Sequence, residues 1–126
     1  MVVVGAGGHA IEILQLLLKD FAAEDIALFD DTGHIPSLAA LYPVINSLEK
    51  LATHFATQSE FVLATGSPRS REALAGKCTG AGGKLTSVIA STAIIGNYNV
   101  SLGNGINVMH RVLITGDVWI GEGVLI

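Results

Sequence analysis

The chain has 126 residues, of which 50% are hydrophobic and 14% charged, and this composition argues against disorder. A net charge of −4 with only 7 Lys and Arg residues argues against a nucleic-acid-binding surface. No apolar run is long enough to span a membrane, so no membrane partner is expected. The single cysteine, Cys78, has no internal disulfide partner, and we expect a cytoplasmic protein of one or two small domains.

The first part of the chain alternates between strand-like and helix-like segments. Short apolar runs predict strands at residues 1–4, 26–29, 44–45, 60–65 and 85–89. Helical spacing and capping patterns predict helices over 9–20, from Asn46 to about 55, and from Ser67 to the glycines at 80–83. Residues 32–43 contain glycine and proline and are expected to form a loop. This alternation predicts a Rossmann-like parallel sheet with right-handed crossovers.

The second part carries a six-residue repeat. Valine or isoleucine recurs every six residues, and a second aliphatic column follows two residues later; the columns are Ile94, Val100, Ile106, Val112, Val118, Val124 and Leu102, Val108, Ile114, Ile120, Ile126. Neither a helix nor a plain strand has this period, whereas hexapeptide repeats build a parallel β-helix. A β-meander with accidental spacing is the alternative. We place the boundary near residue 89, which gives domains 1–89 and 90–126.

The glycine-rich segment from Gly5 to Ala10 follows a predicted strand and opens a predicted helix. It fits the dinucleotide fingerprint, in which bare N–H groups at a helix N-terminus bind phosphate. The alternative is a tight turn without a ligand. His9 lies in this segment, where it either contacts a ligand or serves only the start of the helix.

Three further positions follow predicted strands at the same edge of the sheet. Asp30 and Asp31 end the second strand, where a carboxylate can accept hydrogen bonds from a ribose or a base. Gly66 ends the strand at 60–65, next to a helix start. The alternatives are a solvated turn for the aspartates and a plain helix-start turn for Gly66. Arg69 and Arg71 either reach a phosphate or remain solvated.

The repeat contains two residues with a candidate role, His110 and Trp119. His110 is a candidate general base, because the unperturbed pKa of histidine is near neutrality, and the alternative is a turn residue. Trp119 is expected to point outward, as a subunit contact. No metal site is predicted.

The combination of GAGGHA, then FDD, then LATGSPR, then hexapeptide repeats resembles the family of sialic-acid O-acetyltransferases and bacterial amino-sugar N-acetyltransferases. The resemblance implies a Rossmann-like domain that binds a sugar or nucleotide-activated sugar. It also implies a left-handed β-helix that binds acetyl-CoA between the subunits of a homotrimer. The substrate contacts that it implies are Gly7, Gly8, His9, Asp30, Asp31 and Gly66.

The resemblance also implies where the catalytic histidine of this family is expected, which is beyond Ile126. The repeat from Val100 to Ile126 makes about one and a half coils, and so short a solenoid leaves a strand edge unpaired. We therefore expect the chain to be part of a longer protein. The reaction implied is acyl transfer, in which a base takes a proton from a sugar amine or hydroxyl that attacks the thioester.

Two other functions remain open at this point. An NAD-dependent dehydrogenase would use the glycine motif with Asp30 on the ribose, and it predicts a longer α/β chain after Gly66. The other is a non-catalytic module for sugar-nucleotide binding or trimerisation, which is all that the 126 residues would amount to by themselves.

Overall fold

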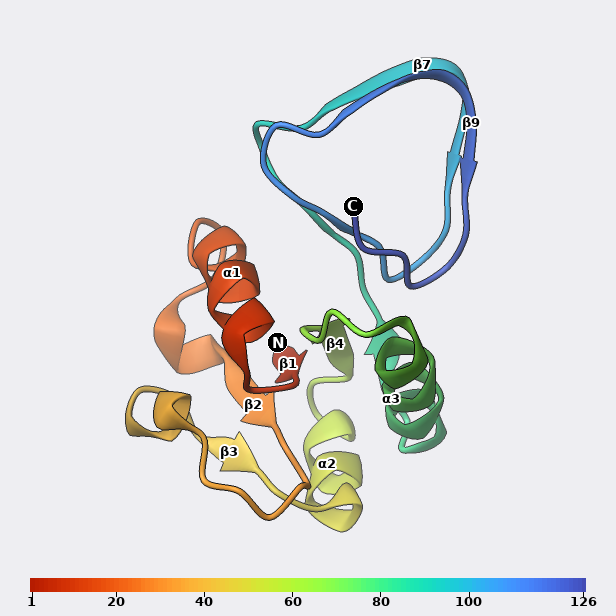
Figure 1. Cartoon of the computed structure of the whole chain (residues 1–126). Coiled ribbons are helices and arrows are strands. Elements are labelled where there is room, and N and C mark those ends of the chain that lie inside the picture. Colours follow the sequence, from red (N-terminus) through yellow and green to blue (C-terminus); the bar gives the residue numbers. More distant parts are fainter.

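The computed structural model describes residues 1–126 and shows two parts, a sheet with helices and a triangular coil (Figure 1). The sheet has five parallel strands in the order β3-β2-β1-β4-β5. They are β1 (Val2–Val4), β2 (Ala27–Phe29), β3 (Val44–Ile45), β4 (Glu60–Leu63) and β5 (Lys84–Leu85). Central β1 is hydrogen-bonded to β2 on one side and to β4 on the other, so the strand order reverses at β1, as in a Rossmann-like sheet.

Helices cover both faces of this sheet. They are α1 (Gly8–Leu17), α2 (Leu48–Phe55) and α3 (Pro68–Gly80), with short 3-10 helices at Ala23–Asp25 and Ser37–Ala40. Helix α1 packs on the face that carries Val3 and Leu28. Helices α2 and α3 pack on the opposite face, which carries Val2 and Phe29. Successive strand residues point to opposite faces, and both faces are covered, which explains why the strands are continuously apolar.

The second part is the beginning of a left-handed parallel β-helix. Its strands are β6 (Val88–Ile89), β7 (Ile94–Leu102), β8 (Asn107–Val108) and β9 (Leu113–Ile120). Strand β6 pairs with β8, and β7 pairs with β9, all in parallel. Val100 lies beside Val118, so one coil is 18 residues long. Figure 1 shows the coil end-on as a triangle, which confirms the β-helix predicted from the repeat.

The six-residue period has a backbone counterpart in the corners of the triangle. Residues with positive φ recur every six positions, at Asn99 (50°), Gly105 (69°), Arg111 (64°), Asp117 (52°) and Gly123 (71°). Glycine, asparagine and aspartate tolerate this left-handed conformation best, and they occupy four of these five corners. One hexad therefore makes one side of the triangle.

Two predicted strand positions differ from the structure. The strand predicted over 85–89 is two strands, because Leu85 ends the sheet whereas Val88 pairs with β8. Ile94, expected in the inner column, is 65% exposed and lies beside Leu113. An extra residue between Ile95 and Tyr98 shifts the register of that coil, which moves Ile94 out of the column.

The capping residue predicted at Asn46 is found one residue later, and the helix begins at Leu48. Ser47 is the N-cap of α2, and its side chain accepts a hydrogen bond from the backbone N–H of Lys50. Ser67 caps α3 with Pro68 at its first position, as predicted. The division into domains 1–89 and 90–126 stays a prediction.

Candidate functional site

The glycine loop, residues 5–10, forms the turn from β1 into α1. Gly5 has φ 108°, and a Cβ there would lie only 3.0 Å from the carbonyl oxygen of Ala64. The turn thus runs tight against the end of β4, and only glycine fits. Gly7 and Gly8 differ, because no atom lies within 4 Å of a Cβ built on either. No side chain caps α1, so the N-terminus of this helix is open to an anion.

A cavity of about 360 Å³ lies in front of this loop. It is at the carboxyl ends of β1, β2 and β4, where parallel sheets bind ligands at a reversal of strand order. All six substrate contacts predicted from the sequence line it: Gly7, Gly8, His9, Asp30, Asp31 and Gly66. Sequence reasoning missed Thr32, Thr65 and Ser70, which also line it and which carry no distinctive motif. The structure brings the predicted residues together, while their roles stay predictions.

The two aspartates of the cavity have different surroundings. One carboxylate oxygen of Asp30, Oδ1, accepts hydrogen bonds from the backbone N–H of Thr32 at 2.9 Å and from its hydroxyl at 2.6 Å. Asp31 instead forms an ion pair with Lys77 of α3. The charge of Asp31 is therefore compensated within the protein, whereas Asp30 has no ionic partner.

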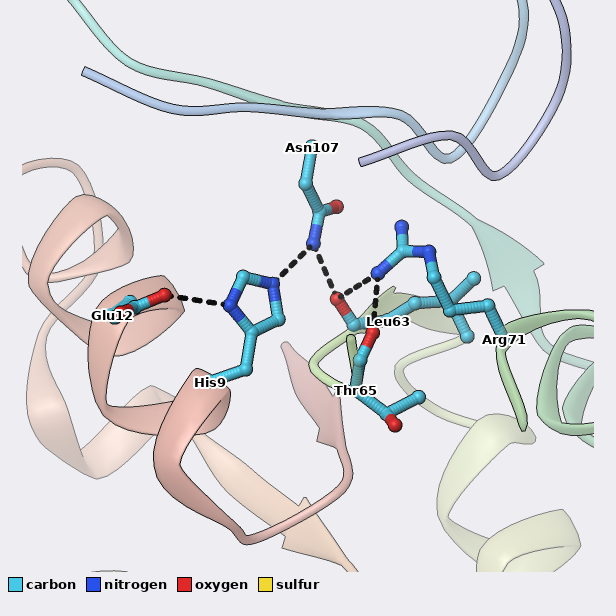
Figure 2. A network of polar contacts seen from close by, with 6 residues as sticks. All are labelled: His9, Glu12, Leu63, Thr65, Arg71 and Asn107. Atoms are coloured by element: carbon cyan, nitrogen blue, oxygen red, sulfur yellow. Dashed lines mark hydrogen bonds and ion pairs between the residues drawn. The ribbon is translucent and has the colours of Figure 1, made fainter. Parts of the chain in front are cut away.

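His9 connects the glycine loop to the β-helix (Figure 2). Its side chain is 12% exposed, and Nδ1 lies 2.8 Å from the Glu12 carboxylate. Its Nε2 lies 3.4 Å from the side-chain amide nitrogen of Asn107 in β8, which also donates to the carbonyl oxygen of Leu63 at 2.6 Å. A residue of the β-helix thus contacts a side chain that lines the cavity.

Arg71 of α3 is 4% exposed and binds backbone carbonyls only. Its guanidinium donates to Gly123 at 2.6 Å, Thr65 at 2.9 Å, Gly105 at 3.4 Å and Leu63 at 3.5 Å. Burial lowers the pKa of this guanidinium. The sequence left two alternatives for Arg71, binding a phosphate or remaining solvated, and the structure shows neither. Instead, Arg71 joins the end of β4 to two corners of the β-helix.

A second cavity, of about 740 Å³, lies between α3 and the last corner of the β-helix. Its walls include Arg71 and Glu72 from α3 and Gly123 and Val124 from the coil. Gly66 lines both cavities, so a ligand in the first can extend toward the second.

Three further residues lie away from these cavities. His110 is exposed beside a corner of the coil, with Nδ1 2.6 Å from the hydroxyl of Thr92, and it lines neither cavity. Cys78 is fully buried, and burial raises its thiol pKa to about 12. Trp119 points outward, as predicted, and is 81% exposed.

No three His, Cys, Asp or Glu side chains are grouped so that they could hold a metal ion. None of the helices has the length and apolar character needed to cross a membrane.

A family model described as the PglD N-terminal domain matches residues 1–78. The chain belongs to this family. The match confirms the resemblance to bacterial amino-sugar acetyltransferases. A search of curated proteins gave no match.

Several solved structures share the fold over almost the whole chain. A mutant of perosamine N-acetyltransferase from Caulobacter crescentus, in complex with CoA and GDP-perosamine, is 29% identical with a TM-score of 0.78 over 98% of this chain and 58% of its own. The acetyltransferase domain of PglB from Neisseria gonorrhoeae, with acetyl coenzyme A, is 25% identical with a TM-score of 0.77 over 98% and 59%. WeeI from Acinetobacter baumannii shares the fold with a TM-score of 0.82 and is 22% identical; the match covers 98% of this chain and 58% of WeeI. The chain thus spans about three fifths of the length of these proteins.

Proposed function

We propose that this chain provides the nucleotide-sugar-binding part of an acetyltransferase that transfers acetyl from acetyl-CoA to an amino sugar. The observation that carries the proposal is the cavity in front of the glycine loop, whose lining includes an uncapped helix N-terminus and the carboxylate of Asp30, which has no ionic partner. The first suits a diphosphate and the second suits the N–H or O–H donors of a base or ribose.

Each predicted contact has a role in this proposal. Gly7 and Gly8 leave room for the diphosphate at the start of α1. Asp30 accepts hydrogen bonds from the nucleoside, while Asp31 with Lys77 shapes the wall beside it. His9 and Gly66 lie at the rim, and the sugar extends past Gly66 toward the β-helix.

The similar structures support both proposed substrates, acetyl-CoA and a nucleotide-linked amino sugar. The Caulobacter enzyme is described in complex with CoA and GDP-perosamine, a nucleotide-linked amino sugar, and the Neisseria domain in complex with acetyl coenzyme A. In the reaction, the sugar amine attacks the thioester carbonyl and a base takes the amine proton. The carbon–sulfur bond then breaks, and the protonated base returns the proton to the sulfur, so that CoA leaves as its thiol. Because acetyl-CoA is a cytoplasmic metabolite, we place the reaction in the cytoplasm.

We also propose that the β-helix assembles as a homotrimer. Ile94 and Leu113 are neighbours on β7 and β9 and are 65% and 64% exposed. Trp119, on the next side of the triangle beyond the corner at Asp117, is 81% exposed. Apolar side chains stacked on successive coils form a patch that a second copy can bury. Sedimentation equilibrium tests this: a trimer is expected, and Leu113→Glu should shift it toward monomer.

Calorimetric titration with GDP-perosamine, a UDP-linked amino sugar and NAD tests the ligand class. Binding of a nucleotide sugar, with NAD weaker, supports the proposal, whereas binding of NAD alone would indicate the dehydrogenase. Release of CoA thiol from acetyl-CoA in the presence of the bound sugar is the second measurement. Binding of the sugar without release of the CoA thiol would indicate a non-catalytic binding module instead of an acetyltransferase.

A further inference from the structure

Asn107 is the β-helix side chain that contacts His9, a residue lining the cavity in front of the glycine loop. It is fully buried in β8, between Val88 of β6 and Leu125 of the next coil. Figure 2 shows its amide directed at the end of β4 and at the ring of His9. No sequence motif marks this residue, and the family resemblance did not implicate it.

The hydrogen bonds around Asn107 determine where the protons of His9 lie. The carbonyl oxygen of Leu63 only accepts, so the group 2.6 Å from it must be the NH₂ of Asn107 and not its oxygen. The same NH₂ lies 3.4 Å from Nε2 of His9, which must therefore accept with a lone pair. The Glu12 carboxylate also only accepts, so Nδ1 of His9 carries the proton.

We propose that Asn107 is a positioning residue that holds His9 as the neutral tautomer protonated on Nδ1, on the rim of the cavity. Both ring nitrogens are then engaged, and His9 presents the carbon edge of its ring to the ligand instead of a positive charge. The β-helix thereby orients a ligand-contacting side chain of the sheet domain. The ligand part of this inference rests on the proposed function; the tautomer does not.

The burial of Asn107 supports a role beyond packing. Its Oδ1 atom is buried and has no hydrogen-bond partner. An unpaired buried oxygen is unfavourable, so an apolar residue of similar size would suit this position better for stability alone. We therefore expect Asn107→Leu to fold, which makes the residue testable.

The tautomer is tested in the ligand-free protein by long-range ¹H–¹⁵N correlation of the histidine rings. The wild type is expected to show a protonated Nδ1 and an unprotonated Nε2 for His9. Asn107→Asp replaces the donor by an acceptor, so Nε2 should gain a proton. The charged groups around the ring are Glu12 on its own helix and Asp30 and Asp31 of the same cavity.

Asn104→Asp is the matched control, because it adds the same charge at an exposed position of the same coil. It should leave the His9 signals unchanged. A wild-type His9 protonated on Nε2, or identical His9 signals in the wild type and Asn107→Asp, would overturn the proposal.

A double-mutant cycle separates positioning from folding. Binding of GDP-perosamine is measured for the wild type, Asn107→Leu, His9→Ala and the double variant. Asn107→Leu should weaken binding about fivefold in the wild type, the value of one hydrogen bond, and hardly at all when His9 is absent. Equal losses in both backgrounds would show that Asn107 acts through the fold, against the proposal. If no variant binds any nucleotide sugar, the proposed function fails while the tautomer measurement still stands.

Discussion

The Nε of Arg71 donates to the carbonyl oxygen of Gly123 at 2.6 Å, from a helix of the sheet domain to a corner of the β-helix. The same guanidinium also binds Gly105 in the preceding coil and the end of β4. A planar group with five donors can bind several carbonyls at once, so one side chain fixes the β-helix to the edge of the sheet where the cavity in front of the glycine loop lies.

Replacing Arg71 is therefore expected to loosen the junction between the two parts. Arg71→Met should lower the free energy of unfolding by about 3 kcal/mol, because it removes charge-assisted hydrogen bonds and leaves buried carbonyls unpaired. Arg71→Lys should recover only part of this, since an ammonium cannot reproduce the planar fork. Urea denaturation measures both. Arg69→Met, an exposed change in the same helix, is the control, and equal stability of the two methionine variants would contradict the prediction.

Alanine substitutions at three glycines of the β-helix can distinguish the stability cost of a positive φ from the cost of crowding by neighbouring atoms. Gly121 has neither positive φ nor a close neighbour. Gly123 has φ 71°, and a Cβ there would meet only a Leu63 side-chain carbon, at an ordinary contact distance of 3.9 Å. Gly105 has φ 69° with a Cβ position 2.3 Å from Cγ of Leu85. Alanine should be nearly neutral at Gly121, cost about 1 kcal/mol at Gly123, and cost more at Gly105.

Thermal unfolding of the three alanine variants gives this order directly. Leu85→Ala combined with Gly105→Ala should recover part of the loss by making room for the new methyl group. A Gly105 variant as stable as the Gly123 variant would show that Leu85 moves aside without cost.

The sequence was sufficient to predict the fold, because both parts have a strong local period. Apolar strand runs followed by helical spacing predicted the sheet, and the hexads predicted the coil, whose corners recur every six residues. One exception, Ile94, arises from one extra residue between Ile95 and Tyr98. A single inserted residue hardly alters a hydrophobic pattern, but it reverses which side chains face inward.

The cavity residues could be predicted for a different reason. Residues that directly follow parallel strands must gather at one edge of the sheet, so Asp30 and Gly66 were placed by topology alone. Asn107 and Arg71 could not be predicted in this way. Their burial depends on how the β-helix docks against β4, which is a tertiary contact between segments 44 and 52 residues apart.

Asp30 is expected to contribute binding energy without contributing much to the fold. Asp30→Asn keeps the oxygen that accepts from Thr32 but removes the charge. Affinity for GDP-perosamine should fall about tenfold, the loss of one hydrogen bond to a charged group, with an unchanged melting temperature.

Asp31→Asn is the informative comparison for Asp30, because the charge of Asp31 already pairs with Lys77. Calorimetry should show a smaller loss for this variant. An equal or larger loss would mean that Asp31, and not Asp30, contacts the nucleoside.

Cys78 is expected to report on unfolding and to give stability a pH dependence. It is fully buried, and its pKa is about 12 against an ordinary value of 9.0, so iodoacetamide at pH 8 should label it only after the protein opens. Below pH 9 the thiol is neutral in both states and adds nothing to the pH dependence. Between pH 9 and 12 only the unfolded state loses the proton, so stability should fall as pH rises. Urea denaturation across this range should show a steeper fall for the wild type than for Cys78→Ala, and parallel curves would contradict this.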